Sequence, residues 1–429
     1  MIGPAETAGP ASSDPARART AGSPAVADRA YLDHAATSPM PAAVLEAYTG
    51  ALRVVGNPAS THGHGQRAGE LLERSRERIA SALGCDRAEL ILTGGGTESI
   101  NLAIKGICWA RRRTADGGAG GPGARNVILV AEGEHHATLE AAEWLRDDQG
   151  FELRWLPLDG DGRLAPATLA AAVAEVGAER IALVSVLWAN NEVGTVQPVA
   201  ELCGIANAAG VPVHVDAVSA LGQVPVSLVE SGAAAISVSA HKIGGPVGVG
   251  ALALGRSTPA DALLHGGSQQ RARSGTQDVA GAAAFAAALD AALAGADPRP
   301  EQIARVAAMR DRLIVGVRTI DPTAVLRGAD PMAPGARLPG NAHFTFPGCQ
   351  GDSLVFLLDA AGVSASVGSA CRAGVAELSH VLQAMGVPDR EAAGALRFTL
   401  GPETRESEVD ALLDALPQAL ERAHAAGLS

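Results

Sequence analysis

Residues 211–246 read VPVHVDAVSALGQVPVSLVESGAAAISVSAHKIGGP, and this stretch decides the fold. It contains two short apolar runs of the kind that form buried strands. Asp216 ends the first run, and Lys242 follows shortly after the second. The two residues are 26 positions apart, which is about one strand–helix–strand unit. Adjacent strands would therefore present both side chains to one pocket at the carboxyl edge of a sheet.

The same alternation of apolar strands and helices continues on both sides of this stretch, which predicts an α/β domain with a mostly parallel sheet. The predicted strands are residues 89–93, 126–131, 181–187, 211–216, 234–238 and 250–254. An alanine-rich helix over 280–294 ends at a Gly- and Pro-containing boundary. Beyond it, helices near 302–320, 353–361 and 406–425 with a strand at 343–346 predict a smaller α+β domain.

The expected organisation has four parts. Residues 1–29 form a disordered extension that is rich in Ala, Pro, Ser and Thr and has no apolar core of a signal peptide. Residues 30–47 form a segment that joins the small domain, residues 48–300 the large domain, and residues 301–429 the small C-terminal domain.

Composition excludes several classes of protein. The net charge of −12 and the lack of a long basic cluster argue against nucleic acid as the main partner. The chain has no run of about 18 apolar residues, which is the length that a membrane span requires, so no membrane span is predicted. The five cysteines are scattered without a CxxC pair, which fits a reducing cytoplasm and not a disulfide framework or a zinc site.

Lysine is almost absent from the chain. Of 34 basic residues, only Lys105 and Lys242 are lysines. An amine that must lose its proton and attack a carbonyl cannot be replaced by a guanidinium, which stays protonated. Both lysines are therefore candidate nucleophiles, although survival of a surface lysine by chance is an equal alternative for Lys105.

A glycine-rich turn, TGGGTES over residues 93–99, follows a predicted strand and opens a predicted helix. Backbone N–H groups at such a turn can approach an anion, and the helix N-terminus favours negative charge. Gly96 and the hydroxyl of Thr97 would then belong to a phosphate site. A plain strand–helix turn is the alternative, and the spacing does not fit the dinucleotide fingerprint of a nicotinamide enzyme.

The polar residues at the strand ends suggest a cofactor with a phosphate, a carbonyl and a pyridine ring. A buried Asp216 needs a cation, and a protonated pyridine nitrogen would supply one, although an aspartate that caps the next helix is equally common. Ser239 and His241 could hold the phosphate while Lys242 forms an imine. His135, after the strand 126–131, could stack on the ring. A metal site at the histidine pairs is disfavoured because no set of ligands completes it.

Cys371 lies in a loop of small residues, SVGSACRAG over 366–374, next to Arg372. A loop position and a neighbouring cation both favour an accessible thiolate. The other four cysteines lie in predicted helices, turns or strand edges and are interpreted as structural.

Together these motifs resemble the cysteine desulfurases of the class V aminotransferase superfamily, which are fold-type I enzymes that use pyridoxal phosphate. The resemblance runs from Tyr31 to about Gly401. It is carried, in order, by the segments YLDHAAT (31–37), GNPAS (56–60), GGTES (95–99), ANNEVG (189–194), AHK (240–242), HGGSQ (265–269), RSGT (273–276) and GSAC (368–371). The last segment resembles the long-loop group, whose members pass sulfur to partner proteins.

The resemblance implies a role for each matching residue. Lys242 would be the Schiff-base lysine and the base for the substrate proton, and Asp216 would pair with the pyridine nitrogen. His135 would stack on the ring, and Cys371 would take the sulfur of L-cysteine as a persulfide and release L-alanine. The phosphate would be bound by Gly96, Thr97, Ser239 and His241, with Thr276 reaching the other subunit of a homodimer. Asn191 and Arg397 would hold the substrate carboxylate.

Two residues depart from the family pattern. Ser219 stands where the family has a glutamine that hydrogen-bonds the ring oxygen of the cofactor, and Arg372 stands where a small polar residue is commoner. The sulfur acceptor, for example an iron–sulfur scaffold or a tRNA-thiolation enzyme, stays open. A lyase acting on selenocysteine or another amino acid, and a non-catalytic sulfur-carrier subunit, are the alternative functions.

Overall fold

The computed structural model describes residues 29–116, 125–368 and 378–425. The predicted N-terminal extension therefore lies outside the described residues except for Arg29, whose guanidinium pairs with Asp359. Within the described ranges, no helix combines the length and the apolar character that crossing a membrane requires.

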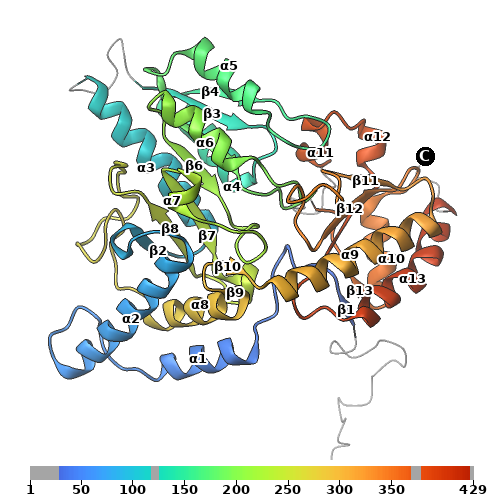
Figure 1. The fold of residues 1–429 in the computed structure, drawn as a ribbon, viewed down its shortest axis with the longest axis horizontal. Helices are drawn as coiled ribbons and strands as arrows, with labels where there is room; N and C mark the ends of the chain where they lie inside the picture. Colours follow the sequence, from blue (N-terminus) through green and yellow to red (C-terminus); the bar gives the residue numbers. More distant parts are fainter. Residues whose placement is uncertain (1–28, 117–124, 369–377, 426–429) are drawn as a thin grey trace, which may run out of the picture.

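A seven-stranded sheet forms the centre of the larger part of the molecule (Figure 1). The strands lie in the order β2-β8-β7-β6-β5-β3-β4. The five strands from β7 to β4 are parallel, and β8 is antiparallel to both of its neighbours. Their bounds are β2 Leu90–Thr93, β3 Val127–Ala131, β4 Glu152–Leu156, β5 Ile181–Leu187, β6 Val213–Asp216, β7 Ala235–Ser239 and β8 Gly250–Leu254. The predicted α/β class with a mostly parallel sheet is confirmed.

Helices cover both faces of this sheet. Because successive side chains of a strand point to opposite faces, a strand can pack against helices on both sides. Along β3, Ile128 and Val130 pack into one apolar cluster together with residues of α3 and α4, whereas Leu129 belongs to the cluster on the opposite face. The helices are α2 Gly63–Ala82, α3 Gly96–Asp116, α4 His136–Gln149, α5 Pro166–Val176, α6 Val199–Ala208, α7 Leu228–Ser231 and α8 Val279–Ala292.

A second apolar core lies in the C-terminal part, around a three-stranded antiparallel sheet in the order β11-β12-β14. Phe344 and Phe398, on neighbouring strands, are fully buried there with Leu313 and Leu412 from the covering helices. The elements are α9 Pro300–Ile320, β11 Val325–Arg327, β12 Asn341–Thr345, α10 Gly351–Ala360, β13 Val363–Ser364, α11 His380–Ala384, α12 Asp389–Ala392, β14 Ala395–Thr399 and α13 Glu406–Ala425.

The first described segment touches both cores. β1 (Ala30–Tyr31) pairs in parallel with β13, and Val44 of α1 (Ala42–Leu52) packs against α8. The chain between β1 and α1 therefore crosses from the C-terminal core to the large sheet, beside the carboxyl ends of its strands. The remaining short elements are η3 Arg87–Glu89, η4 Ala240–Ile243, β9 Leu293–Ala294 and β10 Asp297–Pro298.

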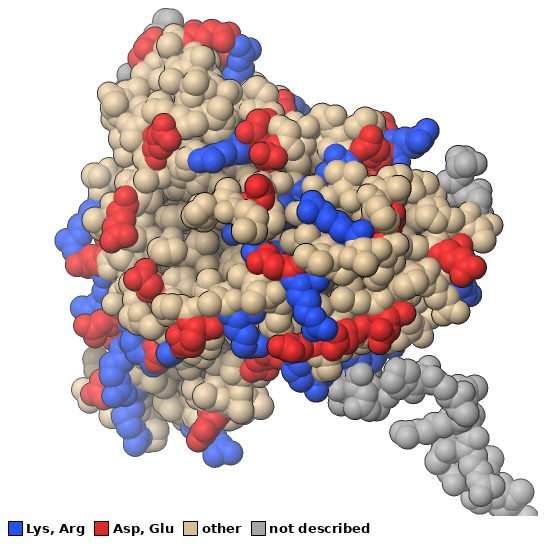
Figure 2. All heavy atoms as spheres, turned by 45° about the vertical axis from the view of Figure 1, so that its right-hand side comes forward, with Lys and Arg blue, Asp and Glu red and all other residues tan. Residues whose placement is uncertain are grey.

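The surface charge agrees with the acidic composition. On the face in Figure 2, acidic and basic side chains of the described residues are interspersed, and the basic ones do not merge into a large patch. This face offers no electrostatic footprint for a nucleic acid backbone.

Candidate active site

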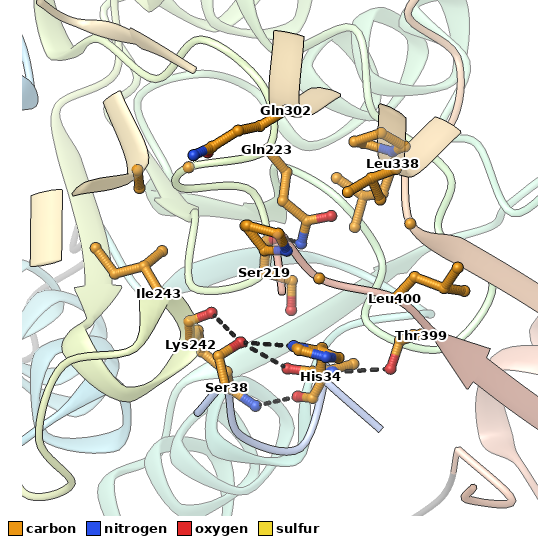
Figure 3. A pocket seen from close by; sticks show the side chains of 18 of the residues that line it. His34, Ser38, Ser219, Gln223, Lys242, Ile243, Gln302, Leu338, Thr399 and Leu400 are labelled. Atoms are coloured by element: carbon orange, nitrogen blue, oxygen red, sulfur yellow. Dashed lines mark hydrogen bonds between the residues drawn. The ribbon is translucent and has the colours of Figure 1, made fainter. Parts of the chain in front are cut away.

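Lys242 lies on η4, the short turn directly after β7, and the segment between β1 and α1 covers it. The Ser38 hydroxyl donates to the carbonyl of Lys242 at 2.9 Å (Figure 3), and the Ser38 N–H donates to the carbonyl of His241. The Lys242 ammonium donates to the carbonyls of Ala35 and Ala36. The amine is thus held in an enclosed position at the carboxyl edge of the sheet.

The surroundings of Lys242 make its amine easier to deprotonate. Burial is the main cause, and the nearby Arg397 adds to it, so that the pKa falls to about 8 although Asp216 and Asp33 oppose the shift. About a tenth of the amine would be neutral at pH 7, compared with less than a thousandth for a solvated lysine. The predicted nucleophile therefore lies where a lysine can act as one.

Asp216 ends β6 and is 2% exposed. Its Oδ1 accepts the N–H of Val218 at 2.9 Å, while burial raises the pKa of the carboxyl to about 6 despite that bond and the charge of Lys242. The buried carboxyl is close enough to Lys242 that each affects the other's pKa, as their spacing in the sequence predicts. A cation seated against Asp216 would stabilise its charged form.

Glu134 is a second buried carboxyl that the sequence motif contained but did not explain. Its Oε1 accepts the N–H of Leu187 at 2.6 Å, and Leu187 is the cross-strand neighbour of Asp216. Among the residues that the structure describes, its Oε2 has no hydrogen-bond partner within the usual distance and angle. Burial and the charge of Asp216 raise the pKa of Glu134 well above the usual range, so both conditions favour its neutral form.

His135 caps the N-terminus of α4. Its Nδ1 accepts the N–H of Ala137 at 3.1 Å, and burial together with Lys242 lowers the ring's pKa to about 4. The ring is therefore neutral at pH 7, and the bond to Nδ1 leaves the proton on Nε2. A neutral, oriented imidazole beside Lys242 suits stacking on a flat aromatic ring better than a charged one would.

The glycine-rich turn lies against the end of β7. A Cβ on Gly96 would come within 2.8 Å of Val218 and 3.5 Å of Ser239, and a Cβ on Gly250 would meet the backbone of Gly95 at 2.7 Å. Only glycines allow this approach, which brings the first turn of α3 beside the Ser239 side chain. The N–H groups of that turn and the hydroxyls of Ser239 and Thr97 form a setting suited to a phosphate.

Arg397 on β14 joins the two cores at the site. Its Nη1 donates to the carbonyl of Asn191 at 2.9 Å, and its Nη2 pairs with Asp33 at 2.7 Å. Its Nε is buried without a partner among the described residues. A substrate carboxylate would satisfy that donor, which fits the role predicted for Arg397. Asp33 was missed, although it lies in the YLDHAAT segment.

A cavity of about 370 Å³ adjoins this site between the two cores. Ser219, Lys242 and Asn191 line it, and Figure 3 shows Ser219 and Gln223 on its wall beside Lys242. Gln223 donates its amide to the carbonyl of Ser219 at 3.0 Å, so this longer side chain is already engaged. The short Ser219 leaves space where the family's glutamine would extend.

One predicted residue among those that the structure describes, Thr276, is not brought into the same place. Thr276 is exposed on the segment between β8 and α8 and does not line the cavity, although Arg273 of the same segment pairs with Glu98 of α3. Cys371 and Arg372 lie outside the described residues.

The arrangement fits pyridoxal phosphate. Its aldehyde requires an amine of lowered pKa, its ring nitrogen a buried carboxylate, and its phosphate a helix N-terminus that glycines leave open. Lys242 and Asp216 supply the first two features from the ends of the adjacent strands β7 and β6, and Gly96 supplies the third from the turn after β2.

Comparisons with known proteins show the family to which the chain belongs. The model of the family described as "Aminotransferase class-V" matches residues 30–412. An IscS-like cysteine desulfurase of Mycobacterium tuberculosis is 48% identical over 93% of this chain and 98% of its own length. Cysteine desulfurase IscS of Dictyoglomus turgidum is 38% identical over 91% and 94%.

Solved structures agree as well. A NifS-like protein aligns with a TM-score of 0.80 and 33% identity over 92% of this chain and all of its own. The structure titled "SspA in complex with cysteine" aligns with a TM-score of 0.71 and 25% identity over 87% and 99%. The chain belongs to the aminotransferase class-V family and, within it, to the cysteine desulfurases, which depend on pyridoxal phosphate.

Proposed function

We propose that this enzyme takes the sulfur of L-cysteine onto Cys371 and passes it to an acceptor protein. The thiolate of Cys371 attacks the substrate sulfur, and the bond between that sulfur and Cβ breaks. The electron pair of the broken bond stays on Cβ, which then takes up a proton. The products are L-alanine and a persulfide on Cys371, so atoms and electrons balance without a further reactant. The observation that carries the proposal is the placement of Asp216 and Arg397 near Lys242, where the charge of each affects the pKa of the amine.

The protein residues divide the work. When bound, pyridoxal phosphate withdraws electrons from the substrate Cα and weakens the bond to the sulfur. Arg397 and Asn191 orient the substrate carboxylate, and Asp33 holds the guanidinium in position. Lys242, with its lowered pKa, takes the proton from Cα and returns one later. His135, which is neutral and carries its proton on Nε2, would stack on the cofactor ring and fix the orientation of that ring during the proton transfers.

The other cysteines support the assignment of Cys371. Burial raises the pKa of the Cys85 and Cys203 thiols to about 12, and it also raises the pKa of the Cys108 and Cys349 thiols. Thiols held neutral by burial are poor nucleophiles and poor carriers of sulfur. The remaining cysteine, Cys371, is the one that the sequence sets beside a cation in a loop of small residues.

We further propose that the active form is a homodimer in which Thr276 reaches the phosphate site of the second copy. The exposed position of Thr276, away from its own cavity, supports this, as do the exposed Leu52 and Val55 around the end of α1. In this arrangement the large domain, 48–300, binds the cofactor, and the small domain, 301–429, carries Cys371. A monomeric mass for the active enzyme would contradict it.

The proposed function has a direct test. We expect the purified enzyme, incubated with L-cysteine without reductant, to release alanine and to gain 32 mass units, about one sulfur atom, on the peptide that contains Cys371. Peptide mass spectrometry would locate the sulfur. A persulfide on another cysteine would overturn the assignment of Cys371.

Ser219 leads to a prediction particular to this chain. Replacing Ser219 with Gln is expected to add a hydrogen bond to the ring oxygen of the cofactor, because the cavity has room beside Lys242 for the longer side chain. The pH at which the bound cofactor changes its absorbance should then shift. Gln223→Ala, which alters the same wall four residues away, serves as the control and should leave that pH unchanged. An unmoved titration in Ser219→Gln would refute the argument.

A further inference from the structure

The imidazole of His34 is enclosed where the segment between β1 and α1 meets the turn between β14 and α13. The residue is 8% exposed, and the ring of Tyr31 lies edge-on to it, with 5.3 Å between the two ring centroids. A Cβ on Gly401 would come within 2.2 Å of Nδ1 of the imidazole, so the ring fits only against a glycine. The main-chain N–H of His34 donates to the carbonyl of Thr399 at 3.2 Å. The ring therefore has a fixed place beside the end of β14.

Four hydrogen bonds run in series through this ring, from the N–H of Gly401 to the carbonyl of Lys242. The Gly401 N–H donates to Oγ1 of Thr404 at 2.9 Å, and this oxygen lies 3.2 Å from Nε2 of His34. On the other side of the ring, Nδ1 lies 3.4 Å from Oγ of Ser38, which is 2.9 Å from the Lys242 carbonyl. Figure 3 shows the two links that Ser38 makes.

The donor of each link follows from the two ends of the series. The Lys242 carbonyl can only accept, and it is nearer to the Ser38 hydroxyl than the carbonyl of His34, which lies at 3.5 Å. The Ser38 hydroxyl thus donates to Lys242, and its oxygen accepts from Nδ1 of the ring. At the other end the Gly401 N–H can only donate, which leaves the Thr404 hydroxyl to donate to Nε2. The series is complete only when the imidazole is neutral and carries its proton on Nδ1.

The protonation of His34 agrees with this requirement. Burial lowers the pKa of the ring to about 4, although the nearby carboxylates of Glu408 and Asp33 oppose the shift. The ring is therefore neutral at pH 7, with one nitrogen that donates and one that accepts.

The series joins the main chain of Lys242 to the C-terminal core. At its far end, Nη1 of Arg305, on α9, donates to the carbonyl of Thr404 at 2.8 Å. At its near end, the segment that contains Ser38 also contacts the amine of Lys242, which donates to the carbonyl of Ala36 at 3.2 Å. One short segment thus contacts both the main chain and the amine of this lysine.

We propose that His34 is a positioning residue for Lys242: its imidazole links the C-terminal core, through Ser38, to the main chain of the lysine and so fixes where the amine lies. The inference rests on the proposed role of Lys242 as attachment point and base. Hydrogen bonds in series polarise one another, so the loss of one link weakens the others. A displaced amine reacts slowly because proton transfer requires hydrogen-bond distance. His34 contributes no group to the reaction.

The tautomer of His34 gives a test that does not depend on activity. In the unmodified enzyme with its cofactor bound, ¹⁵N NMR of histidine-labelled protein at pH 7 should find the proton of His34 on Nδ1. The signal would be assigned by its loss in His34→Gln. A proton on Nε2, or one on each nitrogen, would overturn the inference, because the Thr404 hydroxyl would then have no acceptor in the ring.

Kinetics test the consequence for Lys242. His34→Phe keeps an aromatic ring beside Tyr31 but removes both nitrogens, and should lower kcat for alanine release by roughly 10-fold. The absorbance change that occurs when L-cysteine replaces Lys242 on the cofactor should slow by a similar factor. The dissociation constant of L-cysteine should stay unchanged, because Arg397 is retained. His34→Gln keeps a donor and an acceptor and should recover most of kcat. Equal losses in both variants would contradict the proposal.

A second variant covers failure of His34→Phe to fold. Thr404→Val removes the hydroxyl at the far end of the series while keeping a branched side chain, and Thr404 does not line the cavity. It should lower kcat in the same direction. Added to His34→Phe it should have no further effect, because both residues act through one series. An unaltered kcat in Thr404→Val would refute the proposal.

The matched control is Thr195→Val. Thr195 is buried, and its hydroxyl accepts the N–H of Ala329 at 2.9 Å and donates to a backbone carbonyl, so its loss also leaves a backbone N–H without that partner. We expect a similar loss of stability with kcat unchanged. An equal fall of kcat in Thr195→Val and Thr404→Val would count against a specific role of the series. Absence of cofactor on Lys242 in the unmodified enzyme would instead refute the proposed function.

Discussion

Lys242→Ala is expected to lower alanine production from L-cysteine by at least about a thousandfold, because it removes both the covalent attachment of the cofactor and the base for the substrate proton. Asp216, the α3 turn and Ser239 remain, so the variant should still bind pyridoxal phosphate reversibly. Borohydride reduction followed by peptide mass spectrometry should find the cofactor on Lys242 in the unmodified enzyme and on no peptide of the variant.

Two controls sharpen this result. Lys242→Arg keeps a positive charge next to Asp216 but cannot lose its proton, so it should be as inactive as Lys242→Ala. Lys105→Ala removes the only other lysine, whose ammonium lies 4.3 Å from the ring centre of Trp144, and should keep both cofactor and activity. Retention of more than about a tenth of the activity in Lys242→Ala would argue against its role as base.

The central strands could be predicted from the sequence because burial on both faces makes them continuous apolar runs. The bounds predicted for β5 and β8 are those observed. The edge strand β4, ELRWL, was missed because its side chains alternate between exposed and partly buried positions and include two charged residues. Such a pattern is also compatible with a loop.

The site residues that could be predicted from the sequence are those that directly follow predicted strands. Asp216 ends β6, and Lys242 lies on the turn directly after the adjacent strand β7, so their spacing in the sequence predicted that they lie close together. The pairing of Asp33 with Arg397 joins residues 364 positions apart, and no local pattern indicates such a contact. The contact between His34 and Thr404 was out of reach for the same reason, because these residues are 370 positions apart.

Cys371→Ala should abolish sulfur transfer while leaving the cofactor site intact. The variant keeps Lys242, Asp216 and Arg397, so it should bind cofactor and L-cysteine and show the absorbance change of substrate binding. Without a thiolate to attack the substrate sulfur, however, alanine release should fall by roughly a thousandfold or more. Alanine assays would measure the loss of turnover, and persulfide mapping would separately measure the loss of sulfur transfer to the protein.

The matched control is Cys85→Ala, which removes the one partly exposed thiol among the described cysteines. The pKa of Cys85 is raised to about 12 by burial and by Glu89 and Asp86, so this thiol should carry no sulfur and its loss should leave turnover unchanged. If Cys371→Ala instead releases alanine at the normal rate, the enzyme breaks the carbon–sulfur bond without a protein thiol. It would then be a lyase, because Lys242 marks the cofactor whereas only Cys371 marks the transfer of sulfur to the protein.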